Sequence, residues 1–524
     1  MDTLVTIIAL LGGTAVVVGV AERIHLPYPV LMLIAAAGVS LMPWVPALVI
    51  DPELILPLFL PPLLYATAQR TSWSVFRTRW RSLVLLAVAL VVVTVTAAAG
   101  VSLLMVQGMT AAAAIALGAV VAPPDPIAVE SVSSKVGMPR RLTSVLQTEG
   151  LFNDAMAIVI FQAAINAVVA KQGVGWQVVP AFVVGAVIAG TLGFAAAWFV
   201  GWLTALLPNL VARSAITAVA PFAVYLVAEK VHASGVVAVV VMTVELGRRS
   251  RPQDSAERLA RQSFWGIVEL LMTGLAFGLM GMELEVILTD ESIEIVPMLP
   301  TVAAVCVAVI VVRFLWMLAI RLLGGTEQRT AVPGTHREVL VLTWCGMRGL
   351  ATMALALSLP QTDGAGDPFP ARAFIIVTAA GVLVTTLVIP GLTLPSLMRV
   401  LRLPRDPQGE RRRDRALAKR ARDASLRALE RAPEWASMPE PMRNTLRRRI
   451  GGLQQLLSRD DADLDPEAQA RIHESLTVAE RIMRAALDAG REEILRARRE
   501  VGVDPEAADR VLHRLDLRTV MLDR

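Results

Sequence analysis

The sequence predicts an all-α polytopic membrane protein of about 13 transmembrane helices, followed by a charged helical tail. Two observations lead to this fold class. Of the 524 residues, 55% are hydrophobic and the mean hydropathy is +0.59, whereas soluble domains are roughly 45–50% apolar. The charged residues are also unevenly spread, because 50 of the 95 lie between Arg402 and the end of the chain.

The membrane part is read from its apolar segments. A spanning helix needs roughly 20 apolar residues. Segments of this kind start near residues 3, 28, 52, 82, 110, 142, 176, 212, 233, 262, 297, 337 and 372. The segments near 52, 212 and 233 are short or polar, so the prediction of thirteen helices holds to within one.

Basic residues predict the orientation, because cytoplasmic loops are rich in Lys and Arg. With thirteen helices, the N-terminus outside and the C-terminus cytoplasmic, the arginine-rich loops all face inward. The outside loops then hold little beyond Lys171, Lys230 and Arg372. We therefore expect a transmembrane domain at 1–400 and a cytoplasmic helical regulatory tail at 401–524, in the inner membrane of a bacterium.

Several classes of function are disfavoured by composition. The net charge of +5 is small and its basic residues follow membrane topology, so no nucleic-acid partner is expected. The two cysteines, Cys306 and Cys345, both lie in apolar stretches, which excludes a disulfide framework. We see no enzyme motif and expect no cofactor.

Three prolines surround an acid in the fifth predicted span. Pro123, Pro124 and Pro126 flank Asp125, and proline breaks a helix because it cannot donate the backbone hydrogen bond. Irregular backbone is tolerated at membrane depth only inside protein or beside a water-filled cavity. The break would offer free carbonyls and a carboxylate to a small cation. The alternative is a simple kink capped by Asp125.

The sixth predicted span carries Glu149, Asn153 and Asp154. Glu149 and Asn153 are four residues apart and share a helix face, and Asp154 lies about 100° round from Asn153. Two acids and an amide within about one and a half turns can bind a hard cation and exchange protons. The alternative is that these groups satisfy one another and bind nothing.

Two arginines and one further acid are also predicted inside the membrane, where a charge is costly. Arg348, between two glycines of the twelfth span, needs a buried acid, and Glu149 is the predicted partner. Arg313 would oppose the negative helix ends near the break. Glu269 either pairs with Arg313 or lies beside an access path.

An internal repeat would bring these pieces together. Transporters are often built from inverted repeats with a broken helix at matching places. If helices 1–6 match helices 8–13, the broken fifth helix corresponds to the twelfth. Arg348 would then lie where two interrupted helices cross.

At these residues the chain resembles the monovalent cation/proton antiporter family of bacterial, archaeal and animal sodium/proton exchangers. The resemblance covers about 1–400 and rests on motifs in the expected order. Glu269 and Arg313 fall in matching segments. The motifs are Pro124 to Val129, Glu149 to Asp154, and Gly346 to Gly349.

The resemblance implies roles for individual residues. Asp154 would carry the ion and the proton, with Asn153 beside it, and Asp125 with its backbone would line the site. Glu149 would pair with Arg348. An Asn-Asp pair goes with electroneutral exchange in the family. The family also implies homodimers in which a core domain moves against a dimerisation domain.

The chain departs from the family pattern at Pro124 and Gly150, where relatives carry Thr and Ser. As a whole, the resemblance implies exchange of Na⁺, with K⁺ as the alternative, for H⁺ by alternating access. Such exchange would serve pH and cation homeostasis. A gated cation channel and a membrane ion sensor that signals through its tail are the rival functions. No symmetric filter sequence favours the channel.

Overall fold

The computed structural model describes most of the chain up to residue 403. The described residues are 2–24, 26–42, 52–69, 84–125, 128–131, 138–150, 153–171, 178–231, 233–249, 255–289, 294–323, 333–363, 366–403 and short stretches between 416 and 447. Within them the regular elements are helices, apart from one isolated bridge between Thr362 and Pro368. The chain divides into two compact units, Met1–Leu403 and Pro404–Arg524.

The first half of the larger unit holds helices that are mostly apolar. They are α1 (Asp2–Ile24), α2 (Tyr28–Ser40), α3 (Pro52–Ala68), the π-helical segment η1 (Val84–Ala89), α5 (Leu90–Met105), α6 (Ala111–Val121), α8 (Arg140–Gly150) and α9 (Asn153–Val169).

The second half contains longer helices and two further short ones. They are α10 (Val178–Leu206), α11 (Leu210–Lys230), α12 (Gly235–Arg249), α13 (Ser255–Thr289), α14 (Ile295–Leu323), α15 (His336–Trp344), α16 (Leu350–Leu357), α17 (Arg372–Leu383), the π-helical segment η3 (Val384–Val388) and α18 (Ile389–Leu401).

Every predicted span corresponds to a helix or a pair of helices in this order. Seven helices among the described residues are long and apolar enough to cross a membrane, and four more are apolar but shorter. The membrane-protein class is therefore supported by the structure. The total of thirteen spans and the inverted repeat stay predictions.

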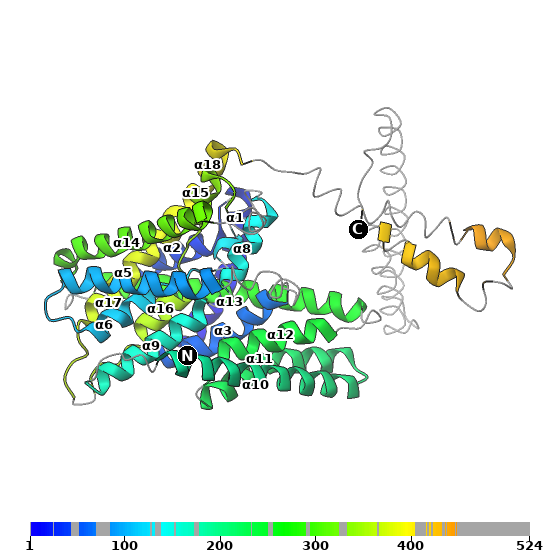
Figure 1. Cartoon of the computed structure of the whole chain (residues 1–524), viewed down its shortest axis with the longest axis horizontal. Helices are drawn as coiled ribbons and strands as arrows, with labels where there is room; N and C mark the ends of the chain where they lie inside the picture. The colour runs from blue at the N-terminus through cyan, green and yellow to red at the C-terminus, as the bar shows by residue number, and fades with distance from the viewer. Residues whose placement is uncertain are drawn as a thin grey trace, which may run out of the picture. The chain divides into compact units, whose positions relative to one another are not determined.

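Two groups of helices flank the interior of the larger unit (Figure 1). In one, α10, α11 and α12 pack against one another. In the other, α5 packs against α14 and α6, and α6 packs against α9. Helices α3 and α13 contact each other, and α13 also packs along α2. Helix α16 contacts α3, α6, α9, α13 and α17.

The predicted fifth and twelfth spans are both interrupted. Thr110 caps the start of helix α6, because its hydroxyl accepts a hydrogen bond from the Ala113 N–H at 3.2 Å, and the helix ends at Val121. Non-helical backbone follows from 122 to 125, as prolines that lack an N–H require. Non-helical residues 345–349 likewise separate α15 from α16. Both breaks lie in segments where the sequence predicts them.

In the smaller unit the described residues include helical stretches at 423–430 and 440–445. Arg447 lies over the ring of Trp435 and pairs with Glu430 at 3.1 Å. Most of the predicted helical tail lies outside the described residues.

Candidate functional site

The two broken helices touch at their interruptions. The backbone N–H of Asp125 donates to the carbonyl of Met347 at 2.7 Å. This bond joins the break after α6 to the break between α15 and α16. Backbone groups that a continuous helix would have satisfied internally are thus satisfied across the crossing.

The Asp125 carboxylate faces the beginnings of two half-helices. Its Oδ1 accepts from the Ala128 N–H and its Oδ2 from the Leu350 N–H, both at 3.4 Å. A negative charge is favourable at both places, because helix N-termini carry partial positive charge. At Gly349 a Cβ would collide with this carboxylate. The close approach therefore requires glycine at that position.

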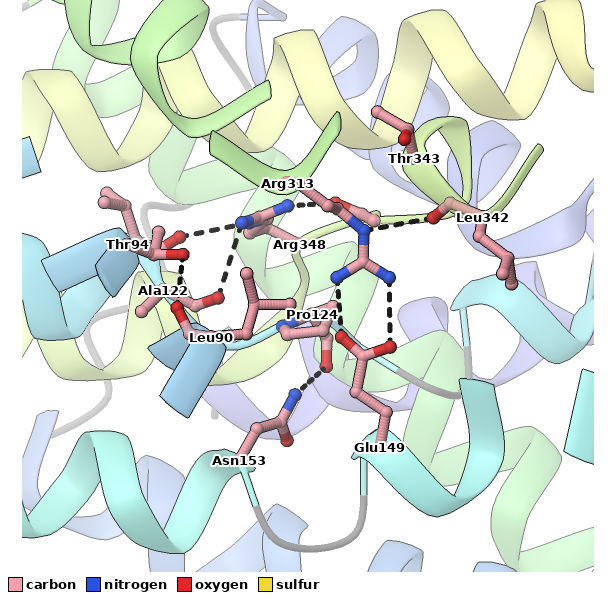
Figure 2. A network of polar contacts seen from close by, with 12 residues as sticks. Leu90, Thr94, Ala122, Pro124, Glu149, Asn153, Arg313, Leu342, Thr343 and Arg348 are labelled. Carbon is pink, nitrogen blue, oxygen red and sulfur yellow. Dashed lines mark hydrogen bonds and ion pairs between the residues drawn. The ribbon is translucent and has the colours of Figure 1, made fainter. Parts of the chain in front are cut away.

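Arg348 caps the other end of the break. Its guanidinium donates to the carbonyls of Val121 at 3.0 Å and Ala122 at 3.4 Å, and also to that of Gly346. Figure 2 shows this side chain directed at the end of α6. The side chain is 2% exposed. A buried cation here compensates the partial negative charge of the terminal carbonyls of α6.

Glu149 pairs with Arg313 and not with Arg348, so the predicted partner is wrong. The Arg313–Glu149 distances are 2.5 Å from Nη1 to Oε1 and 3.0 Å from Nη2 to Oε2 (Figure 2). Arg313 also donates from Nε to the carbonyl of Leu342 at 3.0 Å. The physical reason is that Arg348 is held by backbone carbonyls at the break, while α14 brings Arg313 to the carboxylate.

Asn153 and Asp154 begin α9, beside the break of α6. The Asn153 side-chain N–H donates to the carbonyl of Pro124 at 3.2 Å (Figure 2). Its Oδ1 is buried without a hydrogen-bond partner among the described residues. Asp154 is 6% exposed. The first turn of α9 thus brings an amide and a carboxylate to the interrupted backbone.

Asp125 and Asp154 line one cavity. Its empty volume is about 540 Å³, including the open mouth. Within the described residues no group of three or more His, Cys, Asp or Glu side chains could hold a metal ion. The two carboxylates offer oxygen ligands of the kind that hard cations prefer. The other lining residues are Leu60, Leu63, Leu64, Thr67, Pro123, Ala276, Phe277, Gly349, Leu350 and Ala351.

Glu269 lies apart from this cavity. It is half-buried on α13 and precedes the cavity-lining Ala276 by seven residues, which is about 10 Å along a helix. Arg313 makes its ion pair with Glu149, so the predicted Glu269–Arg313 pair is not the one formed. A role for Glu269 in an access path stays a prediction.

Sequence reasoning missed two residues near the crossing. The hydroxyl of Thr386, in η3, accepts from the backbone N–H of Arg348 at 3.2 Å. Thr67, on α3, lines the cavity with the two carboxylates. Both are polar residues in apolar helices, which is the only sequence signal that singles them out.

The sequence and the fold are similar to those of known proteins. Residues 6–400 match the family model described as sodium/hydrogen exchanger, transmembrane. An uncharacterised Na⁺/H⁺ exchanger of Mycobacterium tuberculosis is 31% identical over 416 residues, which cover 77% of this chain and 75% of the relative. The uncharacterised Na⁺/H⁺ exchanger YjcE of Escherichia coli is 29% identical, over 96% of each chain.

A third relative and a solved structure extend the comparison. A sodium, potassium, lithium and rubidium/H⁺ antiporter of Bacillus subtilis is 30% identical over 66% of this chain and 54% of its own. The sodium proton antiporter MjNhaP1 of Methanocaldococcus jannaschii has the same fold, with a TM-score of 0.58 and 18% identity over 76% of this chain and 98% of that one. With the family model matched along residues 6–400, the chain is a member of the sodium/hydrogen exchanger family.

Proposed function

We propose that this protein exchanges a monovalent cation, Na⁺ in the first place and K⁺ in the second, for H⁺ at Asp154. One observation carries the proposal: the carboxylates of Asp154 and Asp125 line the same cavity, beside the contact between two interrupted helices. Membership of the sodium/hydrogen exchanger family supports cation/proton antiport as the activity.

Exchange follows from competition for one carboxylate. A proton and a cation neutralise Asp154 in mutually exclusive ways, so each displaces the other. Asp125 and the backbone at its break supply further oxygens to the cation. Asn153 fixes the carbonyl of Pro124 through its side-chain N–H, at 3.2 Å.

The remaining buried charges have structural roles in this proposal. Glu149 is occupied by Arg313, and Arg348 by the carbonyls that end α6. Neither arginine is directed at the cavity that holds Asp154. The Asp125 carboxylate is held by the Ala128 and Leu350 N–H groups, which leaves Asp154 to exchange. One cation is then traded for one proton and the cycle is electroneutral.

The cellular setting is part of the proposal. The protein works as a homodimer in the plasma membrane of a bacterium, with its N-terminus outside and a regulatory tail in the cytoplasm, and it maintains pH and cation balance. The printed name of the Bacillus subtilis relative covers four alkali cations, which is why K⁺ and Li⁺ are tested together with Na⁺.

Proton flux in everted vesicles tests the proposal. A pH-sensitive dye follows an imposed pH gradient while Na⁺, K⁺ or Li⁺ is added to wild-type protein or to Asp154→Asn. We expect a cation to dissipate the gradient in the wild type alone. Exchange that survives in Asp154→Asn, with the protein inserted, would exclude Asp154 as the carrier. An unchanged rate under an imposed membrane potential would support electroneutrality.

A further inference from the structure

Thr67 is the lining residue that the proposed exchange at Asp154 leaves unexplained. It lies in the last turn of α3 and its side chain is buried. Among the cavity-lining residues that the structure describes, it alone carries a side-chain hydroxyl. The other lining groups from α3 are Leu60, Leu63 and Leu64, which offer no polar atom.

The hydroxyl proton of Thr67 is already in use. Its Oγ1 donates to the carbonyl of Leu63, four residues earlier, at 2.9 Å. Threonine in an apolar helix commonly makes this bond to the preceding turn. A hydroxyl has one proton and two lone pairs, so the oxygen has only lone pairs left to offer. It can accept from a donor or bind a cation, and it cannot donate to a carboxylate.

The position of Thr67 complements the two carboxylates. Asp154 comes from α9, and Asp125 from the break that follows α6, whereas Thr67 comes from α3, which packs against α13 and α16. A cation between these elements would meet oxygens from more than one side. Hard cations gather several oxygens around them, and two carboxylate side chains alone leave the α3 side without a ligand.

We propose that the Oγ1 of Thr67 is a neutral ligand of the transported cation and helps to set which alkali cation the site prefers. This inference rests on the proposed exchange at the cavity. The hydroxyl contributes to cation binding alone, because a proton on Asp154 needs no second ligand. Loss of the hydroxyl therefore weakens cation binding without changing the affinity of Asp154 for the competing proton.

That difference gives a distinctive readout. When cation and proton compete, the apparent KM for Na⁺ is constant at high pH and rises as the pH falls below a transition. This transition pH reports protonation of the site carboxylate. Removal of a ligand specific to the cation raises the apparent KM by the same factor at every pH and leaves the transition pH unchanged. Removal of structural support for the carboxylates would shift the transition pH as well.

The experiment compares Thr67→Val, which is nearly isosteric, with Thr67→Ser, which keeps the hydroxyl. Thr243→Val is the matched control, because Thr243 is also buried and donates to the carbonyl of Val239 at 2.7 Å, outside the cavity lining. The apparent KM for Na⁺, Li⁺ and K⁺ is measured in proteoliposomes at several pH values between 6 and 9.

We expect Thr67→Val to raise the KM for Na⁺ and Li⁺ roughly tenfold, as for a lost bond to a charged group. The KM for K⁺ should rise less, since a larger ion binds each oxygen more weakly. The transition pH should not change in Thr67→Val. The KM values of Thr67→Ser and Thr243→Val should stay within twofold of wild type.

A KM for Na⁺ in Thr67→Val within twofold of wild type, or a shifted transition pH, would overturn the assignment. If Thr67→Val does not insert, Thr67→Ala removes the same oxygen with a smaller side chain and is held to the same expectation. Asp154→Asn is measured in parallel. Exchange retained there rejects the proposed function itself, while loss there and an unchanged Thr67→Val rejects only the ligand.

Discussion

Arg313 and Glu149 form a two-armed ion pair inside the protein, with N–O distances of 2.5 and 3.0 Å. Their side chains are 2% and 1% exposed. Because Arg313 also donates to the carbonyl of Leu342, the pair ties α8, α14 and α15 together. The Arg313 guanidinium thus neutralises Glu149 and also holds the end of α15, the helix that leads into the second break.

Removing one partner of this pair should be strongly destabilising. Glu149→Gln leaves Arg313 buried without its counter-charge, which costs about 3–5 kcal/mol. The double variant Glu149→Leu with Arg313→Met removes both charges and should recover much of that loss. Thermal unfolding of the purified protein in detergent measures both. A loss in the double variant equal to the sum of the losses in Glu149→Leu and Arg313→Met, each measured singly, would show that the two residues are not coupled.

Gly349→Ala should disturb the site through Asp125. The added methyl group meets the Asp125 carboxylate, and relief of such overpacking costs about 1–3 kcal/mol. We expect a lower unfolding temperature and a raised KM for the cation. Gly190→Ala on α10 is the control, because nothing lies within 4 Å of its added Cβ. An unaltered KM in Gly349→Ala would show that the carboxylate can move at no functional cost.

Thr386→Val should loosen the backbone at Arg348. The Arg348 N–H would lose its acceptor at 3.2 Å, and a buried unsatisfied donor costs about 1–3 kcal/mol. Thr378→Val makes the same chemical change at a buried threonine of α17 whose hydroxyl has no partner among the described residues. Unfolding temperature and exchange rate are compared in both. The idea is wrong if the two variants behave alike, or if Thr386→Ser is as damaged as Thr386→Val.

Lys171 should not contribute to the pH dependence of exchange. It contacts Asp363 and Asp367, each at 3.1 Å, and hydrogen bonds to Asp363 and then Asp367 raise the pKa of Lys171. Because the pKa of Lys171 is raised, its ion pairs contribute fully to folding stability below the pKa of an unfolded lysine, about 10.4. That contribution is lost only as the pH rises through the higher pKa of the folded protein.

The lysine therefore stays charged between pH 6 and 9. We expect Lys171→Gln to leave the shape of the pH–rate profile unchanged over that range, with rates within twofold of wild type. Dye-based flux measurements at half-unit pH steps test this expectation. A profile displaced along the pH axis would mean that the charge of Lys171 acts on the exchange site.

Local chemistry made much of the site predictable. Prolines around Asp125 can end a helix and leave an acid at its break whatever the surroundings, because the missing N–H is a property of the residue. Asp125 also caps the next helical segment by accepting from the Ala128 N–H, as a short acid just before a helix can do whatever surrounds it. Its second cap, on Leu350, depends on the crossing and was beyond reach of the sequence.

The partner of Glu149 was not predictable in this way. Two buried arginines were available, and the choice depends on which helix passes the carboxylate, at a separation of 164 residues from Arg313. Backbone carbonyls as partners for Arg348 leave no trace in the side-chain pattern. The place of Thr67 was likewise not predictable, since nothing in the sequence of α3 signals which of its residues line the cavity.

The buried charges at the crossing also bear on the valence of the cargo. Arg313 and Arg348 carry two positive charges, and Glu149 and Asp125 match them when both are ionised. The balance is then complete only if Asp154 holds one unit of positive charge, as H⁺ or an alkali ion. A divalent cation would leave a surplus in a medium where unpaired charge is expensive. In the proposed exchange, the two fixed arginines would therefore disfavour Ca²⁺ and Mg²⁺ at the two carboxylates.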